Sequence, residues 1–157
     1  MKTTDFLHLD TKTTNTVANE LQSLLADFQV YYTNLRGFHW NIKGRGFFQL
    51  HEGFEKMYDD AAAKIDEVAE RILTLNGTPA HNFTDYLKTA SIKETGVVSN
   101  GDEAVKNILE SLKTLIGKER KVLKTASEGG DETTVALMSD FIAEQEKSVW
   151  MLTAYLS

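Results

Sequence analysis

The apolar residues between positions 47 and 76 recur at intervals of three and four, and no other feature constrains the fold as strongly. They are Leu50, Phe54, Met57, Tyr58, Ile65, Val68, Ile72 and Leu75. This spacing is the period of a helix with one apolar face. The stretch follows Gly44-Arg45-Gly46 and stops at Asn76-Gly77, with Pro79 just beyond, which is typical of a helix end. We therefore predict one long helix over residues 47–76.

Four ionisable side chains lie along one stripe of this predicted helix. His51 and Glu55 are four residues apart and share a face. Asp66 and Glu70 repeat that spacing about three turns further along. The stripe borders the apolar face, where a histidine or carboxylate without a partner is costly to bury. Imidazole and carboxylate together suit iron, zinc or manganese, so these four residues are candidate metal ligands.

A single copy of the helix cannot bring these ligands together. His51 and Asp66 are separated by roughly 22 Å along the helix axis, whereas metal–ligand bonds are about 2 Å long. A second copy, antiparallel about a two-fold axis near residues 60 and 61, would set the first pair of ligands against the second pair of its partner. Such a dimer holds two equivalent sites by symmetry. Three alanines at 61–63 would let the helices approach closely at its centre.

His39 comes from the preceding segment and reaches the site only through a turn. In an unbroken helix, His39 and His51 would be about 18 Å apart. A reversal at Gly44-Arg45-Gly46 would instead fold one helix back along the other and bring the two histidines together. A lone histidine is more typical of a hydrogen-bonded core residue, but two beside a stripe of carboxylates favour metal binding.

The rest of the chain shows the same helical period. Residues 14–42, 100–128 and 132–155 are predicted to form long helices, and residues 83–89 a short one. Asn15 or Thr14 can cap the first helix, and Asp131 can cap the last. The result is an all-α four-helix bundle.

The short helix falls in the long connection at 77–100, which crosses from one end of the bundle to the other. With no second core indicated, we expect a flexible N-terminal arm over residues 1–13 and a single domain over 14–157.

Three motifs are informative together. They are His39-Trp40-Asn41-Ile42-Lys43-Gly44; Phe48-Gln49-Leu50-His51 with Phe54-Glu55 and Tyr58; and Asp66-Glu67-Val68-Ala69-Glu70-Arg71 with Gly77-Thr78-Pro79. This pattern closely resembles the ferroxidase signature of the Dps family. In that signature a second histidine follows the first by twelve residues, an aspartate follows fifteen residues later, and a glutamate four residues after that, as in His39, His51, Asp66 and Glu70. Dps proteins are the ferritin-like mini-ferritins of starved or oxidatively stressed bacteria, so the resemblance implies a ferritin-like bundle.

The resemblance also implies a function. Two Fe²⁺ ions would bind at each site between subunits, with zinc as a possible substitute. Hydrogen peroxide would be the preferred oxidant, and ferric mineral would be stored in a shell of twelve subunits built from two-fold dimers. The implied ligands are His39, His51, Glu55, Asp66 and Glu70. Trp40 would lie beside the site and donate an electron, although by default it is a core aromatic.

Two regions depart from the family pattern. Glu55 stands where relatives usually carry aspartate, and its longer side chain would alter how the second iron is held. Relatives line an iron-entry channel with acids near the junction of the third and fourth helices. Here that neighbourhood holds Glu128, Asp131 and Glu132, whereas Ser127 and Ala136 replace acids often found in relatives. The three acids have an alternative role as helix caps and dipole partners.

Several of these residues also have interpretations that involve no metal. Asp66 and Glu70 could form surface ion pairs with Lys64 or Arg71, the commonest fate of helix carboxylates. The whole stripe could be a polar dimer contact that binds no metal. The other histidines, His8 and His81, have no potential ligand at helical spacing and receive no role.

Charge weighs against a DNA-compacting role, the main alternative function. The net charge is −6, and the N-terminal arm offers Lys2 and Lys12 against Asp5 and Asp10. Electrostatic binding to phosphates is therefore expected to be weak or absent. The chain has no cysteine, so any metal must be held by nitrogen and oxygen ligands. No apolar run has the length of a signal peptide or membrane span, which makes a soluble cytoplasmic protein the default expectation.

Overall fold

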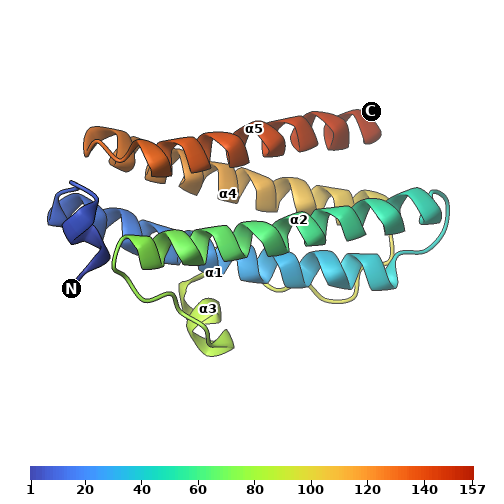
Figure 1. The fold of residues 1–157 in the computed structure, drawn as a ribbon. Coiled ribbons are helices and arrows are strands. Elements are labelled where there is room, and N and C mark those ends of the chain that lie inside the picture. The colour runs from blue at the N-terminus through green and yellow to red at the C-terminus, as the bar shows by residue number, and fades with distance from the viewer.

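The computed structural model describes the whole chain, Met1 to Ser157, and contains only helices and loops. The elements are the 3-10 helix η1 (Thr3–Phe6) and the α-helices α1 (Thr11–Asn41), α2 (Phe47–Thr74), α3 (Phe83–Thr89), α4 (Gly101–Glu128) and α5 (Glu132–Tyr155). Four long helices lie side by side, and the short α3 lies outside them against α1 (Figure 1). The predicted all-α bundle is confirmed, including the short helix between the second and third long helices.

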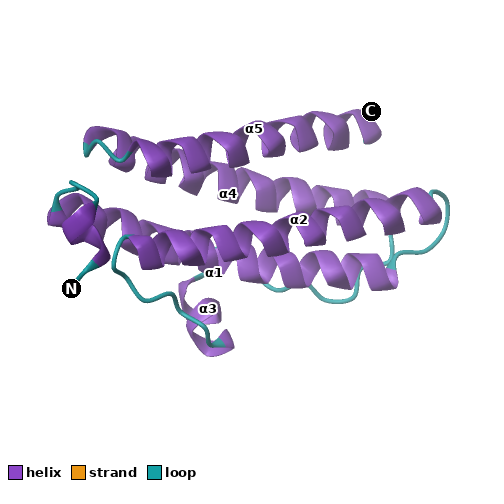
Figure 2. Ribbon diagram, in the orientation of Figure 1, coloured by secondary structure: helices purple, strands orange, loops and turns teal.

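The chain forms two helical hairpins joined by one crossover. Helices α1 and α2 make the first hairpin and α4 and α5 the second, while the segment containing α3 returns the chain to the end where α2 began (Figure 1). Loops are confined to the helix ends and this crossover (Figure 2). Helix α1 packs against α2, α3 and α4, so it is the central element of the bundle. No helix combines the length and apolar character needed to cross a lipid bilayer.

The predicted apolar faces meet in one core. Its fully buried members include Leu21, Leu24, Phe28 and Leu35 of α1, Val68 and Ile72 of α2, Ile108 and Leu115 of α4, and Met138 of α5. Phe28 and Phe141 meet edge to face, with ring centres 6.0 Å apart, and so link the two hairpins. Each large apolar side chain buried in this way contributes about 1.5 to 3 kcal/mol to the stability of the fold.

Polar side chains of α1 fix the path of the crossover. Asp27 is fully buried, and its Oδ1 accepts hydrogen bonds from the backbone N–H groups of Ser91 (2.7 Å) and Ile92 (2.8 Å). Its Oδ2 pairs with Lys118 of α4. About two turns further on, Asn34 donates to the Lys93 carbonyl at 2.9 Å. The crossover backbone therefore finds its hydrogen-bond partners on the central helix.

The first helix begins earlier than its sequence pattern predicts. Asp10, rather than Asn15 or Thr14, is the N-cap, and it accepts from the N–H groups of Lys12 (2.8 Å) and Thr13 (3.0 Å). The helix thus starts at Thr11, three residues before the predicted start of the domain at residue 14. Most of this first turn is exposed, so it carries no apolar period that could have revealed it. The predicted cap at Asp131 is confirmed.

A polar cluster lies inside the bundle near its middle. Glu119 of α4 is fully buried, and its Oε1 accepts a hydrogen bond of 2.6 Å from Gln145 of α5. Its other oxygen has no partner. Burial raises the pKa of the Glu119 carboxyl to about 7, although the Gln145 hydrogen bond and then the charges of Lys64 and Arg120 act in the opposite direction. The folded protein therefore holds a proton that a solvated glutamate would lose.

We expect replacement of Glu119 by glutamine to stabilise the protein at high pH. The folded pKa, about 7, exceeds the ordinary value of 4.5, so proton binding stabilises the fold below 4.5 and this contribution is lost as the pH rises through 7. Glu119→Gln should raise the free energy of unfolding by about 1 to 3 kcal/mol at pH 8 and change it little at pH 5. Urea unfolding at both pH values, at a fixed subunit concentration, measures the difference.

The exposed Glu146→Gln serves as the matched control for this measurement. Glu146 pairs with Arg120 at the surface, so its replacement should change stability little and equally at both pH values. An effect of Glu119→Gln that is the same at pH 5 and pH 8 would contradict the raised pKa.

Candidate metal centre

A tight reversal between α1 and α2 brings the two predicted histidines together. Gly44 and Gly46 have φ angles of 88° and 76°, in the left-handed region that side chains disfavour. The N–H of Lys43 donates to the Ser99 carbonyl at 3.1 Å and fixes the turn to the start of α4. As a result, the rings of His39 and His51 stack with centres 3.8 Å apart and planes 18° from parallel. The turn that the sequence required is confirmed.

The two histidines hold each other through their backbones. The His39 Nδ1 lies 2.7 Å from the His51 carbonyl oxygen, and the His51 Nδ1 lies 2.8 Å from the His39 carbonyl oxygen. A carbonyl oxygen can only accept, so both Nδ1 atoms carry hydrogen. In the neutral rings, each Nε2 therefore keeps a free lone pair. Metal-binding histidines are typically oriented by such a hydrogen bond from the other ring nitrogen.

Two aromatic rings flank the histidine pair. Phe47 stacks on the outer face of His51 at 5.1 Å, and Tyr58 meets His39 edge to face at 5.3 Å. Burial, and then the charges of Glu55 and Asp59, raise the pKa of the Tyr58 hydroxyl above its ordinary value. Tyr58 therefore stays protonated and neutral beside the imidazoles at physiological pH.

The three candidate carboxylates are exposed on α2. Glu55, Asp66 and Glu70 make no ion pair within the chain, because the nearby cations have other partners. Lys64 pairs with Asp60 and Glu144, each at 2.5 Å. The alternative in which Asp66 and Glu70 pair with Lys64 or Arg71 is therefore wrong.

One chain contains only part of a ligand set. No group of three or more His, Cys, Asp or Glu side chains lies close enough to hold a metal ion. The two imidazoles meet at one end of α2, while Asp66 and Glu70 lie towards its other end. Any site that uses all the predicted ligands must therefore include a second chain.

The outer face of α2 carries apolar residues in a symmetric arrangement. Phe48 and Leu73 have 82% and 53% of their surface exposed. They lie equally far on either side of the midpoint between residues 60 and 61, about seven turns apart, and therefore on one face. At the middle, Ala62 and Ala63 are exposed, but Ala61 is buried within its own bundle. The prediction that Ala61 faces a partner is thus wrong.

Trp40 lies at the surface, one residue after His39 in the sequence. With 63% of its surface exposed, it is not the core aromatic that a tryptophan is by default. The Arg36 guanidinium lies 4.6 Å from the Trp40 ring centre and 5.4 Å from that of Tyr32. Tyr32 in turn meets Tyr58 edge to face at 6.1 Å. Cation–π contacts of Arg36 and edge-to-face contacts of Tyr32 and Tyr58 therefore connect Trp40 to His39.

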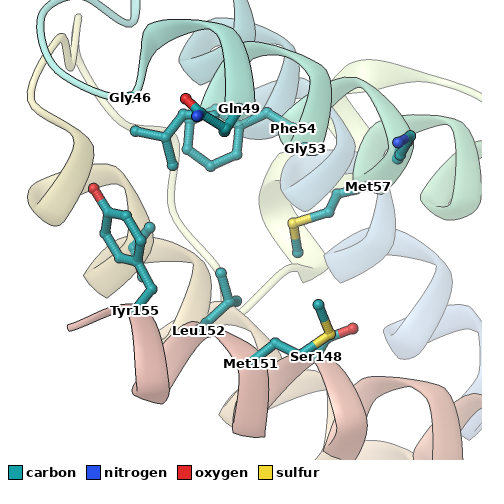
Figure 3. Close-up of a pocket in the computed structure, with 12 residues that line it drawn as sticks. Gly46, Gln49, Gly53, Phe54, Met57, Ser148, Met151, Leu152 and Tyr155 are labelled. Carbon is teal, nitrogen blue, oxygen red and sulfur yellow. The ribbon is translucent and has the colours of Figure 1, made fainter. Parts of the chain in front are cut away.

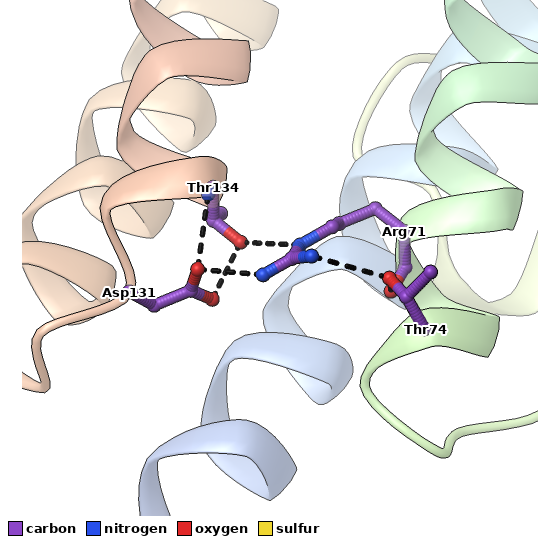
Figure 4. A network of polar contacts seen from close by, with 4 residues as sticks. All are labelled: Arg71, Thr74, Asp131 and Thr134. Atoms are coloured by element: carbon purple, nitrogen blue, oxygen red, sulfur yellow. Dashed lines mark hydrogen bonds and ion pairs between the residues drawn. The ribbon is translucent and has the colours of Figure 1, made fainter. Parts of the chain in front are cut away.

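The acids predicted near an entry channel divide into two kinds. Glu128 and Glu132 are exposed, whereas Asp131 is 1% exposed and caps α5. Asp131 accepts from Arg71 at 2.6 Å, and Arg71 also donates to Thr134 at 2.8 Å (Figure 4). Asp131 is therefore a structural tie between α2 and α5, which agrees with its alternative role as a helix cap. His8 and His81 are exposed.

One large pocket is separate from the histidine pair. It lies between α2 and α5, with a volume of about 640 Å³ and a mostly apolar lining that includes Phe54, Met57 and Leu152 (Figure 3). Neither His39 nor His51 lines it.

The sequence pattern alone did not identify Phe47 as a neighbour of the histidine pair. Its position four residues before His51, on the same helix face, could have revealed the contact.

Comparisons with known proteins agree on one fold and one group of relatives. The model of the ferritin-like domain family matches residues 18–157. A DNA protection during starvation protein from Porphyromonas gingivalis is 55% identical over 139 residues, covering 88% of this chain and 87% of the relative. A Dps protein from Vibrio cholerae, described as a member of a broad superfamily of ferritin-like diiron-carboxylate proteins, superposes with a TM-score of 0.95 at 49% identity and covers 97% and 96% of the two chains. A Dps protein from Bacillus brevis has a TM-score of 0.90 at 36% identity, covering 95% of this chain and 100% of that one.

Replacement of Asp131 is expected to destabilise the fold. Asp131→Ala removes both the N-cap of α5 and the partner of the largely buried Arg71, so the free energy of unfolding should fall by about 2 to 4 kcal/mol. Chemical unfolding measures the loss. Glu132→Ala, at the exposed neighbouring position, should have a much smaller effect. Slower iron uptake in Asp131→Ala without loss of stability would instead support a channel role.

Proposed function

The chain belongs to the Dps family of ferritin-like proteins, and on that premise we propose that it oxidises Fe²⁺ at sites shared between two subunits and stores the ferric product. Iron storage and protection are the general functions of this family. The finer assignment is a ferroxidase that prefers hydrogen peroxide and encloses hydrous ferric oxide in a shell of twelve subunits. Iron is thus both the substrate and the cargo.

One observation supports a metal site that is shared between two subunits. The two stacked imidazoles offer free Nε2 atoms at one end of α2, while Asp66 and Glu70 remain unpaired towards the other end. An antiparallel second copy would complete both sets at once. The exposed Phe48 and Leu73 support this pairing, because the same two-fold axis would set each against the other in the partner.

Each ligand has a role in this proposal. His39, His51 and Glu55 of one subunit, with Asp66 and Glu70 of the partner subunit, bind two Fe²⁺ ions. Each Fe²⁺ gives one electron to the same hydrogen peroxide molecule, whose O–O bond breaks, and two protons complete two water molecules. Holding both irons beside one oxidant makes the transfer of two electrons a single event, so no hydroxyl radical is released.

Two residues modify this centre. Glu55 is one methylene longer than the aspartate usual at this position in the family, so it reaches the second iron with a different geometry. Trp40 supplies the second electron to hydrogen peroxide where a site holds only one Fe²⁺, so that the peroxide still receives two electrons. The contacts of Trp40 with Arg36, of Arg36 with Tyr32, and of Tyr32 with Tyr58 support this role.

Mixed dimers test whether the site is shared. His51→Ala and Asp66→Ala should each abolish rapid Fe²⁺ oxidation in the pure variant, because both sites of each dimer lose a ligand. A hybrid dimer of the two variants keeps one site with all its ligands, so about half of the wild-type activity per dimer should return. Co-expression with two affinity tags gives verified hybrids, and stopped-flow oxidation measures the rate. Hybrids as inactive as the pure variants would argue for a site within one chain.

DNA binding is expected to be weak or absent, in contrast to the compacting role of some relatives. The net charge is −6, and in the arm the carboxylates of Asp5 and Asp10 already accept backbone hydrogen bonds near Lys2 and Lys12. A gel-shift series at low salt with the assembled protein measures the affinity. Tight binding that weakens steeply as salt rises would show that basic groups gather on the assembled surface instead.

A further inference from the structure

The ring of Phe47 stacks on the pair formed by His39 and His51. The Phe47 ring centre lies 5.1 Å from that of His51, with the planes 21° from parallel. His39 stacks on His51 with ring centres 3.8 Å apart, and one face of an imidazole has no room for two nearly parallel rings at these distances, so Phe47 and His39 cover opposite faces. Phe47, His51 and His39 thus form a column of three nearly parallel rings. The spacing between Phe47 and His51 falls within the range of favourable offset stacking.

The hydrogen bond from Nδ1 does not by itself fix the His51 ring. His51 is partly exposed and lies in the second turn of α2, close to the reversal. The outer torsion of a histidine side chain is broad and roughly two-fold. A half-turn about this torsion exchanges nitrogen and carbon positions, which breaks the hydrogen bond to the His39 carbonyl and puts a carbon where Nε2 stood.

The three-ring column hinders this half-turn. During the rotation, the edges of the His51 imidazole sweep through the space on both sides of its plane. His39 occupies one of these sides and Phe47 the other. Removing Phe47 would open the outer side and free the ring to rotate or leave the stack. Orienting groups behind a metal ligand are typically worth about 10- to 100-fold in metal affinity.

Local structure explains how Phe47 reaches this place. It is the first residue of α2, directly after Gly46 with its positive φ of 76°. Phe47 lies four positions before His51, so both side chains lie on the same face one turn apart. The next residue, Phe48, meets Phe47 edge to face at 5.3 Å and is directed to the exposed surface.

We propose that Phe47 is a positioning residue that holds the free Nε2 of His51 in the orientation that binds metal. This inference rests on the proposed function, because it takes His51 as a ligand. The flat face of the Phe47 ring, rather than its bulk, provides the constraint. A leucine would fill much of the same space without presenting a flat surface to the imidazole.

Binding of Co²⁺ in the absence of oxidant tests the proposal without any turnover. The assembled wild-type protein, Phe47→Ala, Phe47→Leu and Phe47→Tyr are titrated with Co²⁺ and followed by calorimetry and by visible absorption. Phe47→Ala and Phe47→Leu should bind about 10-fold or more weakly and with an altered spectrum, whereas Phe47→Tyr keeps the ring and should bind nearly as wild type. Sedimentation velocity verifies assembly, and Phe6→Ala, an exposed phenylalanine in η1, is the control.

A second variant separates failure of this inference from failure of the proposed function. His51→Ala should abolish the same Co²⁺ signal. If it does so while Phe47→Ala and Phe47→Leu bind Co²⁺ as the wild type does, Phe47 has no positioning role and only this inference is overturned. If His51→Ala leaves Co²⁺ binding unchanged, His51 is not a ligand, and both the inference and the proposed metal site are overturned.

Discussion

The reciprocal hydrogen bonds between His39 and His51 are the interaction on which the rest of the site depends. Each imidazole donates from Nδ1 to the backbone carbonyl of the other residue, so the two helices of the first hairpin and the two rings are fixed together. The same bonds leave both Nε2 atoms free. One interaction thus closes the turn, selects the tautomer and directs two potential ligands to the same place.

Most buried polar groups of the bundle have hydrogen-bond partners. Its buried carboxyl groups differ in how fully they are paired. Asp27 and Asp131 are buried carboxylates whose hydrogen bonds and cationic partners tie the crossover and α5 to their neighbours. Such pairs specify where elements meet, because breaking one leaves an uncompensated charge. Glu119 lacks a full set of partners, and burial instead keeps its proton on. A buried carboxyl group is thus a structural tie in one setting and a proton-binding group in another.

Because one chain holds only part of the ligand set, we interpret the outer face of α2 as a contact surface for a second copy. Exposed carboxylates without partners and exposed apolar side chains occur together on this helix, and both are arranged about the midpoint between residues 60 and 61. An isologous contact would use all of them, since each feature on one half of the helix has its complement on the other half. The metal chemistry and the assembly are therefore two aspects of one proposed interface.

The sequence by itself determined the four long helices, the short helix at Phe83–Thr89, the turn at residues 44–46 and the family, because apolar period, glycine placement and motif spacing are local properties that can be read from one chain. It also identified His39 and His51 as neighbours from helix geometry. Tertiary structure alone decided that Arg71 forms an ion pair with Asp131 and Lys64 one with Asp60. It also decided that Asp131 is buried, that Ala61 faces inward and that Trp40 is exposed. Periodicity specifies which residues share a face, but the identity of the partner across a contact depends on how helices distant in sequence are packed against each other.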